Sequence, residues 1–258
     1  MCVLPKLIYP FYQQIAHLPR FTLIAVGSNI VNLSTFAAAN ITYMLLYKLE
    51  IPFFEKFKAS KDPWHWKTDP AGFRSMFTKR TVPLAALNLL VILPLLFALP
   101  PYFDLDEKTT AIEAYPSTLE IAIQLIFFML VEDTAFYWSH RMLHSKFFYS
   151  KIHKIHHEYH SSIGISVYHV HPLEFIFGNA LTSSFGPIIL GKRCHLVTYW
   201  LWVVVRVSEG ADGHCGYEFP WSPFRIFPLS ASSEFHNFHH SHNVGNYCLL
   251  YTSDAADE

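Results

Sequence analysis

The sequence predicts an all-α fold, an integral membrane helical bundle in which helices at the cytosolic face carry a histidine-rich metal site. Three observations predict it. Long uncharged stretches recur along the chain, each close to the roughly 20 apolar residues that a spanning helix needs. Only 15% of the residues are charged, whereas about 25% is usual in soluble domains. Finally, eight of the 16 histidines fall into three tight clusters.

The uncharged stretches give the order of the expected membrane segments. The first two lie between charged residues at 20 and 48 and at 80 and 104, and a third candidate covers 118–138. Two shorter apolar stretches follow, at 175–190 and 195–205, and we expect them to form a hairpin that enters the membrane. Glycine and proline within 175–190 favour a broken helix there. The formal net charge of −1 gives no reason to expect a nucleic-acid partner.

The distribution of basic residues predicts the orientation of these segments. The loop 48–80 carries eight lysines and arginines, whereas the loop 100–118 carries one. Cytoplasmic loops of membrane proteins hold the excess of positive charge. We therefore expect the loop 48–80 and the first two histidine clusters to share the cytosolic side, with the third cluster beside them if 175–205 is a hairpin.

The three histidine clusters predict a metal site. Their spacings are i, i+4 in the first and i, i+3, i+4 in the other two, and on a helix such offsets place side chains on one face. Imidazole suits iron, zinc, copper and nickel, and eight ligands exceed the needs of one ion, so two metals are implied. The clusters comprise His140 and His144; His153, His156 and His157; and His236, His239 and His240.

Two carboxylates precede the first cluster by about two helical turns. Metal-bound histidines usually donate their second N–H to a carboxylate or a carbonyl group. We therefore expect Glu132 and Asp133 to orient the histidine ligands, with interfacial helix caps as the alternative reading. A polar interfacial face is the corresponding alternative for the clusters, and repetition of one spacing argues against it.

Several motifs resemble those of the fatty acid hydroxylase superfamily. Its members are membrane di-iron oxygenases with HxxxH and HxxHH histidine boxes. The resemblance covers 121–247 and includes the three clusters, HPLE at 171–174, DGHCGY at 212–217, FPWSP at 219–223 and GNY at 245–247. Within the superfamily, the HPLE and GNY motifs are most similar to those of the sterol 4-methyl oxidases (methylsterol monooxygenases). Cys215 departs from the serine that is usual in the DGHCGY element.

The resemblance implies a site, an activity and a location. Ten histidines would bind two iron ions: the eight clustered ones together with His171 and His214. The implied reaction oxidises the 4-methyl group of sterol precursors in sterol biosynthesis, with dioxygen and with electrons from NAD(P)H through a reductase and a b-type cytochrome. The implied location is the endoplasmic reticulum membrane, multi-pass, with the histidine boxes facing the cytosol.

Two alternatives remain open on the sequence. One is another member of the superfamily, a sterol or fatty-acyl hydroxylase or a desaturase. The other is a histidine-rich membrane metal carrier, which would be expected to place its ligands inside the spans. Here the clusters follow the ends of the apolar segments, among lysines, which favours an enzyme.

The end of the chain differs in character from the rest. Residues 248–258 correspond, codon by codon, to the translation of a transposase sequencing adapter. We therefore expect 1–247 to form a single membrane-embedded fatty acid hydroxylase-like domain, with its histidine boxes within 132–247, and 248–258 to be a sequencing artefact.

Overall fold

The computed structural model describes residues 4–60, 62–98, 107–225 and 232–242. Within these residues every regular element is a helix, and the only β-type pairing is an isolated bridge between Lys58 and Tyr217. The predicted all-α fold is therefore confirmed. The expected artefact at 248–258 and the GNY motif at 245–247 lie outside the described residues.

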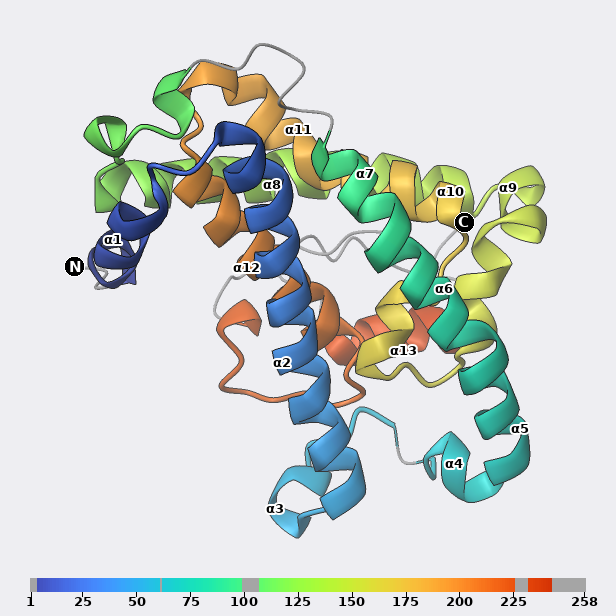
Figure 1. The fold of residues 1–258 in the computed structure, drawn as a ribbon. Coiled ribbons are helices and arrows are strands. Elements are labelled where there is room, and N and C mark those ends of the chain that lie inside the picture. The colour runs from blue at the N-terminus through green and yellow to red at the C-terminus, as the bar shows by residue number, and fades with distance from the viewer. Residues whose placement is uncertain (1–3, 61, 99–106, 226–231, 243–258) are drawn as a thin grey trace.

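Two long helical segments near the N-terminus run in opposite directions (Figure 1). The first ends where Glu50 takes a left-handed conformation (φ 44°). The second begins where the side chain of Asp69 caps the backbone N–H of Gly72 (2.9 Å), with proline at the first helical position. After α1 (Leu4–Ile15), the elements are η1 (Thr22–Gly27), α2 (Ser28–Leu49), α3 (Pro52–Glu55), α4 (His65–Thr68), α5 (Pro70–Met76), η2 (Phe77–Thr81), α6 (Val82–Leu87), η3 (Asn88–Ile92) and α7 (Leu93–Ala98).

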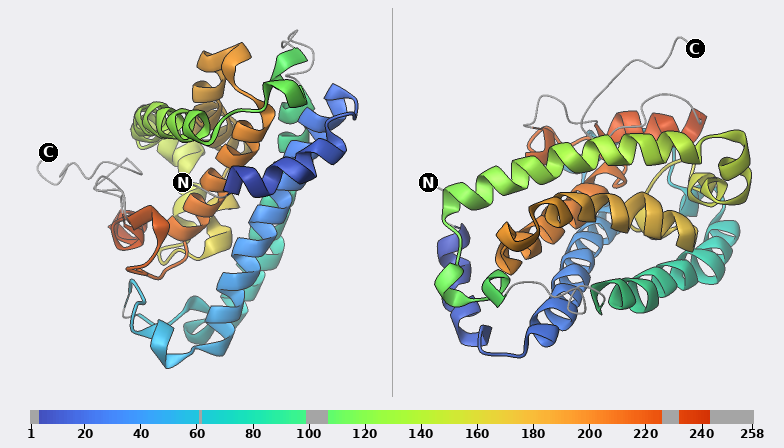
Figure 2. Two further views of the ribbon diagram at one scale, coloured as in Figure 1. Left: turned by 90° about the vertical axis from the view of Figure 1, so that its left-hand side faces the viewer. Right: turned by 90° about the horizontal axis from the view of Figure 1, so that it is seen from above.

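A second pair of long helical segments lies crosswise to α2 (Figure 2). One is α8 (Thr118–Leu143), which follows the short turns η5 (Glu107–Thr109) and η6 (Ile112–Ala114) and is capped by the hydroxyl of Ser117. The other comprises α10 (Pro172–Glu174), η9 (Phe175–Ala180), α11 (Leu181–Leu190) and η10 (Gly191–Arg193). The two pack closely at Gly186, where an added Cβ atom would lie 2.5 Å from the ring of Phe128.

The helix α12 (Leu196–Gly213) lies between the two pairs and forms the core. It packs against α2 and α8. The indole of Trp200 donates to the hydroxyl of Ser28 (3.0 Å), and the indole of Trp202 donates to the carbonyl of Ser183 (2.7 Å). Each indole thus satisfies its N–H while burying a large apolar ring.

Three helical segments in the described residues are long and apolar enough to cross a membrane: Thr22–Leu49, Pro70–Ala98 and Pro172–Arg193. The first two match the expected spans. The third is longer than the broken stretch that we expected at 175–190, because Pro172 starts the helix early and a π-helical turn, η9, carries it past Gly178. The expected partner stretch, 195–205, belongs to the buried helix α12.

The expected span at 118–138 forms α8 but is not among these three segments. It nevertheless exposes an apolar stripe at i, i+4, i+7 and i+11 and buries the opposite face. A helix of this kind contacts lipid on one side and protein on the other. The stripe consists of Leu119, Ile123, Ile126 and Leu130.

The histidine-bearing segments gather beside the loop that follows α2. The hydroxyl of Tyr47 donates to the carbonyl of Cys215 (2.7 Å) and accepts from the N–H of Gly164 (3.0 Å), and the ring of Trp64 packs on Tyr217. The basic loop and the histidine segments therefore lie together, as the sequence predicts. Two of these segments, η7 (His153–Glu158) and α13 (Ser233–His242), carry the second and third boxes, and the short helices α9 (Lys146–Lys151), η8 (Gly164–Tyr168) and η11 (Pro223–Arg225) lie in the connections between the boxes.

Candidate metal centre

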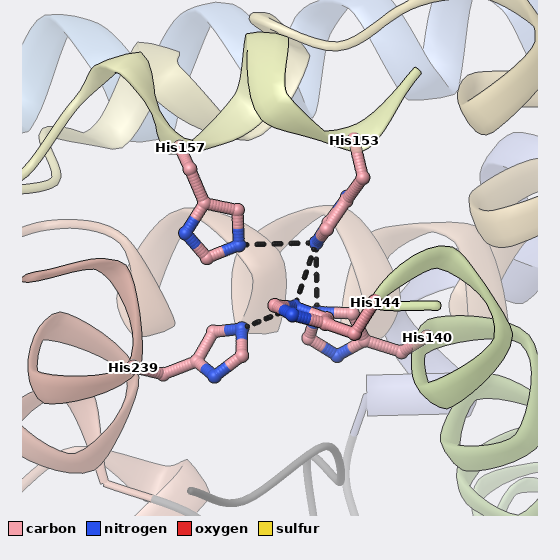
Figure 3. A group of neighbouring side chains, drawn as sticks. All are labelled: His140, His144, His153, His157 and His239. Carbon is pink, nitrogen blue, oxygen red and sulfur yellow. Dashed lines mark hydrogen bonds between the residues drawn. The ribbon is translucent and has the colours of Figure 1, made fainter. Parts of the chain in front are cut away.

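Nine of the ten predicted ligand histidines come together in two groups. Within each group the candidate ligand nitrogens all lie within 4.8 Å of one another. Figure 3 shows the larger group, in which the five rings from three segments of the chain point toward one centre. The larger group consists of His140, His144, His153, His157 and His239, and the smaller one of His156, His214, His236 and His240.

The second histidine box contributes to both groups because of its backbone. Its spacing suggests an α-helical face, but residues 153–158 form a 3₁₀-helix, η7. A 3₁₀-helix rises about 2.0 Å per residue and aligns positions i and i+3. His153 and His156 therefore point the same way about 6 Å apart along the axis, and their ring centroids are 5.5 Å apart. This distance lets one short segment reach two metal positions.

The third box is α-helical and also divides between the groups. His236 and His240 lie one turn apart on α13 and enter the smaller group, whereas His239 enters the larger one. The rings of His157 and His240 stack with centroids 4.8 Å apart. One ring from each group thus forms a shared wall, and the two candidate metal positions are adjacent.

One side-chain acceptor and one backbone acceptor fix the orientation of two of these rings. Nδ1 of His153 lies 2.7 Å from Oε1 of Glu174, and Nδ1 of His214 lies 2.8 Å from the carbonyl oxygen of Gly210. In each case Nδ1 donates the proton, and Nε2 carries the lone pair. Such outer partners orient the histidine ligands of metals and set their tautomers.

The separations between ligand nitrogens suit a bound cation. Nε2 of His153 lies 3.1 Å from Nε2 of His140, of His144 and of His157. In the smaller group, Nε2 of His236 lies 2.8 Å from that of His214 and 3.1 Å from that of His240. Metal–imidazole distances of about 2.1 Å place neighbouring ligand nitrogens about 3 Å apart. A single lone pair on His153 cannot serve three hydrogen-bond donors, so a shared cation satisfies these nitrogens best.

Burial keeps these imidazoles neutral. It lowers the pKa of His157 and of His214 to about 4, and burial together with the neighbouring imidazoles lowers the pKa of His144 to about 2. The pKa values of His153 and His156 lie well below the usual value for the same reasons. Neutral imidazole is the form that binds metal ions, so the site is ready to bind at neutral pH.

One of the two carboxylates expected to orient the ligands pairs with an arginine. Glu132 lies against Arg206 (2.5 Å), which also pairs with Glu209 (2.6 Å). Asp133 is half-buried on α8, and its role beside the histidines stays a prediction. Glu174, which sequence reasoning did not single out, contacts the candidate ligand His153. Its signal in the sequence was a carboxylate at the start of an apolar segment, which is costly without a partner.

The tenth predicted ligand, His171, lies outside both groups. Its Nδ1 accepts a hydrogen bond from the backbone N–H of Leu173 (3.1 Å) and caps α10. Its role as a ligand stays a prediction.

A separate buried network supports η7 from the side of the first helix pair. His169 is fully buried between the carboxylate of Glu158 (2.9 Å) and the hydroxyl of Thr81 (3.0 Å). Glu158 also pairs with Arg80 (2.5 Å), and Thr81 contacts the hydroxyl of Tyr159 (2.8 Å). The network connects η2 to the segment that carries the second histidine box.

A cavity adjoins both histidine groups. Its apolar wall is formed by Phe136, Leu143, Val167 and Val170, and its polar wall by Glu174, Asn179 and Arg206. Histidines from each group complete the lining: His140 and His153 from the larger, and His156, His214 and His236 from the smaller. A small apolar group of a ligand could therefore reach both candidate metal positions.

Comparison with known proteins matches the chain to one family. The model of the fatty acid hydroxylase family matches residues 125–256, a range that includes all three histidine boxes. It extends into 248–258, and the origin of that segment stays a prediction. No solved structure matches the chain.

Curated relatives carry two kinds of name. Methylsterol monooxygenase 2-2 of Arabidopsis thaliana is 34% identical over 92% of this chain and 82% of its own length. Very-long-chain aldehyde decarbonylase GL1-8 of Oryza sativa subsp. indica is 33% identical over 92% of this chain and 84% of its own length. A putative methylsterol monooxygenase of Dictyostelium discoideum is 32% identical over 78% of this chain and 72% of its own length. On its histidine centre, its helical fold and these matches, this chain belongs to the fatty acid hydroxylase family.

Proposed function

We propose that this protein is a membrane di-iron oxygenase that oxidises the 4-methyl group of sterol precursors. The observation that carries the proposal is the pair of adjacent, buried, all-imidazole groups beside a cavity with an apolar wall. Nitrogen ligands without sulfur suit iron, and the apolar wall suits a lipid. The names of two of the relatives support a methylsterol as the substrate.

Each part of the chain has a defined task in this reaction. The larger histidine group would hold one iron and the smaller group the other. Bound iron supplies the activation of dioxygen and the one-electron chemistry, which amino-acid side chains lack. Glu174 keeps the ring of His153 in position. Phe136, Leu143 and Val170 hold the apolar end of the substrate at the site and exclude water.

The basic surface near the site supports the proposal that electrons come from an external protein donor. Dioxygen chemistry on a methyl group requires electrons, which we assign to NAD(P)H through a reductase and a b-type cytochrome. His144 is the ligand that is half-exposed in the larger group, and Arg141, Lys146, Lys151 and Lys154 are exposed on the adjoining segments. An acidic carrier would be attracted to this basic face.

We assign the protein to the endoplasmic reticulum membrane, with the histidine boxes facing the cytosol. The excess of basic residues in the loop 48–80 and its packing beside the histidine segments support this orientation. A metal carrier is less well supported, because the histidines are gathered at one end of the helices rather than along a path through them.

Expression of the chain in yeast that lacks its own sterol 4-methyl oxidase tests the proposed function. We expect 4-methyl sterols to be consumed, as measured by sterol profiling. The His156→Ala variant should lose this activity while still inserting into the membrane, because His156 is one of four ligands in the smaller group. His242→Ala is the matched control, since His242 lies exposed on the same helix as the third box.

Persistence of 4-methyl sterols, with iron-loaded protein in the membrane, would contradict the sterol substrate. Conversion of added fatty-acyl chains or long-chain aldehydes in the same cells would then identify the related activity. Full activity of His156→Ala would remove that residue from the ligand set.

A further inference from the structure

One carboxylate oxygen in the cavity wall has no partner in the protein. Glu174 is only 4% exposed, and its Oε1 receives the hydrogen bond from Nδ1 of His153. Its Oε2 is buried, and no described residue donates to it. Leaving a buried polar atom unpaired is costly, so this oxygen is suited to form a hydrogen bond with a molecule in the cavity.

The second polar group in the same wall is the side-chain amide of Asn179. No described residue hydrogen-bonds this amide, although the backbone carbonyl of Asn179 accepts from Thr182. An amide in an apolar membrane helix normally finds a partner. Asn179 is half-buried and lines the cavity, so the available partner is again a molecule bound there.

The π-helical turn η9 brings these two groups onto one wall. In an α-helix, positions i and i+5 diverge by more than a quarter turn, but the wider π-turn reduces that divergence. Glu174 precedes η9 directly, and Asn179 lies five residues later, within it. Gly178, between them, leaves room for the side chains of α8, and an added Cβ atom there would lie 3.4 Å from Leu143. Glu174, Gly178 and Asn179 all line the cavity.

We propose that Glu174 and Asn179 together bind a hydroxyl group of the lipid substrate. The hydroxyl forms one hydrogen bond with Oε2 of Glu174 and a second with the side-chain amide of Asn179. This inference rests on the proposed function and deepens it. A sterol carries its hydroxyl on the carbon next to the one that bears the 4-methyl groups, so a hydroxyl held on this wall places those methyl groups beside the histidine groups.

The same pair of groups selects against a compound that lacks the hydroxyl. A substrate with hydrogen in place of the hydroxyl leaves both polar groups unpaired. Sites that hydrogen-bond a substrate hydroxyl discriminate strongly against analogues that lack it.

Equilibrium binding and turnover of two ligands test the proposal. The ligands are a 4,4-dimethyl sterol and its 3-deoxy analogue, each added to the detergent-purified, iron-loaded protein. We expect the sterol to bind about 10-fold or more tightly than the deoxy analogue, which is the effect of one or two hydrogen bonds. In Asn179→Leu the preference over the deoxy analogue should fall to about 3-fold or less, because the sterol loses a hydrogen bond and the deoxy compound no longer buries an unpaired amide.

Two further variants keep the comparison interpretable. Asn29→Leu is the matched control, because Asn29 lies in an apolar helix but already bonds the carbonyl of Ala25 in its own helix. It should leave the preference for the hydroxyl unchanged. Asn179→Ala removes the amide without adding bulk and replaces the leucine variant if that variant loses iron or aggregates.

The outcomes separate this inference from the proposed function. Binding preferences that depend on Asn179 without any oxidation of the sterol would overturn the proposed function and leave the hydroxyl site standing. Oxidation of the sterol with equal preferences in wild type and both Asn179 variants would overturn the hydroxyl site alone. A wild-type protein that binds sterol and deoxy analogue equally, or neither of them, would also overturn it.

Discussion

Removal of the carboxylate of Glu174 should weaken iron binding in the larger histidine group. Its Oε1 lies 2.7 Å from Nδ1 of His153, and both side chains are almost fully buried. Leaving Nδ1 buried without an acceptor costs about 1–3 kcal/mol, which corresponds to about 5–150-fold in affinity. Loss of such outer partners costs about the same factor at other metal sites.

Two substitutions of Glu174 should weaken iron binding to different degrees. In Glu174→Gln the amide oxygen can still accept from His153, so we expect a loss of about 10-fold in iron affinity. In Glu174→Leu no acceptor remains and Nδ1 is buried without a partner, so we expect about 100-fold. Iron content after equilibration with graded chelator concentrations measures both, and Glu113→Gln, at an exposed glutamate, is the control. Wild-type iron retention in Glu174→Leu would refute the view that Glu174 holds this ligand.

Three further predictions concern acid, packing and buried charge. Burial lowers the pKa of His157 and of His214 to about 4, so between about pH 6.5 and pH 4 the unfolded chain binds more protons than the folded one. The free energy of unfolding of the iron-free protein should therefore be highest above pH 6.5 and fall on acidification, as measured by thermal unfolding at pH 7 and pH 5; higher stability at pH 5 would contradict this. Gly186→Val would place a Cβ atom 2.5 Å from the ring of Phe128 and should destabilise the protein by about 1–3 kcal/mol, visible as a lower Tm that an exposed substitution such as Ser241→Val does not produce. Arg206→Met leaves Glu132 and Glu209 buried without their cation and should cost about 3–5 kcal/mol; an unchanged Tm in detergent would show that the ion pairs do not stabilise the junction of α8 and α12.

Much of the site could be read from the order of residues alone, because local spacing decides which side chains share a short segment. The three boxes, with His214 from the DGHCGY element, supply the nine histidines that converge, and the uncharged stretches match two of the apolar helices. The eight clustered imidazoles already pointed to nitrogen ligands and to more than one ion.

Tertiary structure decided what spacing cannot express. His153 and Glu174 are 21 residues apart in the sequence, and they meet because η7 packs beside α10. Glu132 pairs instead with Arg206, because α8 packs against α12. Which carboxylate contacts a histidine therefore depends on how these helices pack. The 3₁₀ backbone of η7 divides one box between two metal positions, and the π-turn η9 brings Asn179 to the cavity. Both are backbone forms that packing imposes on sequences whose spacing alone suggests an ordinary α-helix. The sequence by itself thus determined which histidines could bind metal, and the fold decided how they are grouped, which atoms orient them and which side chains line the cavity.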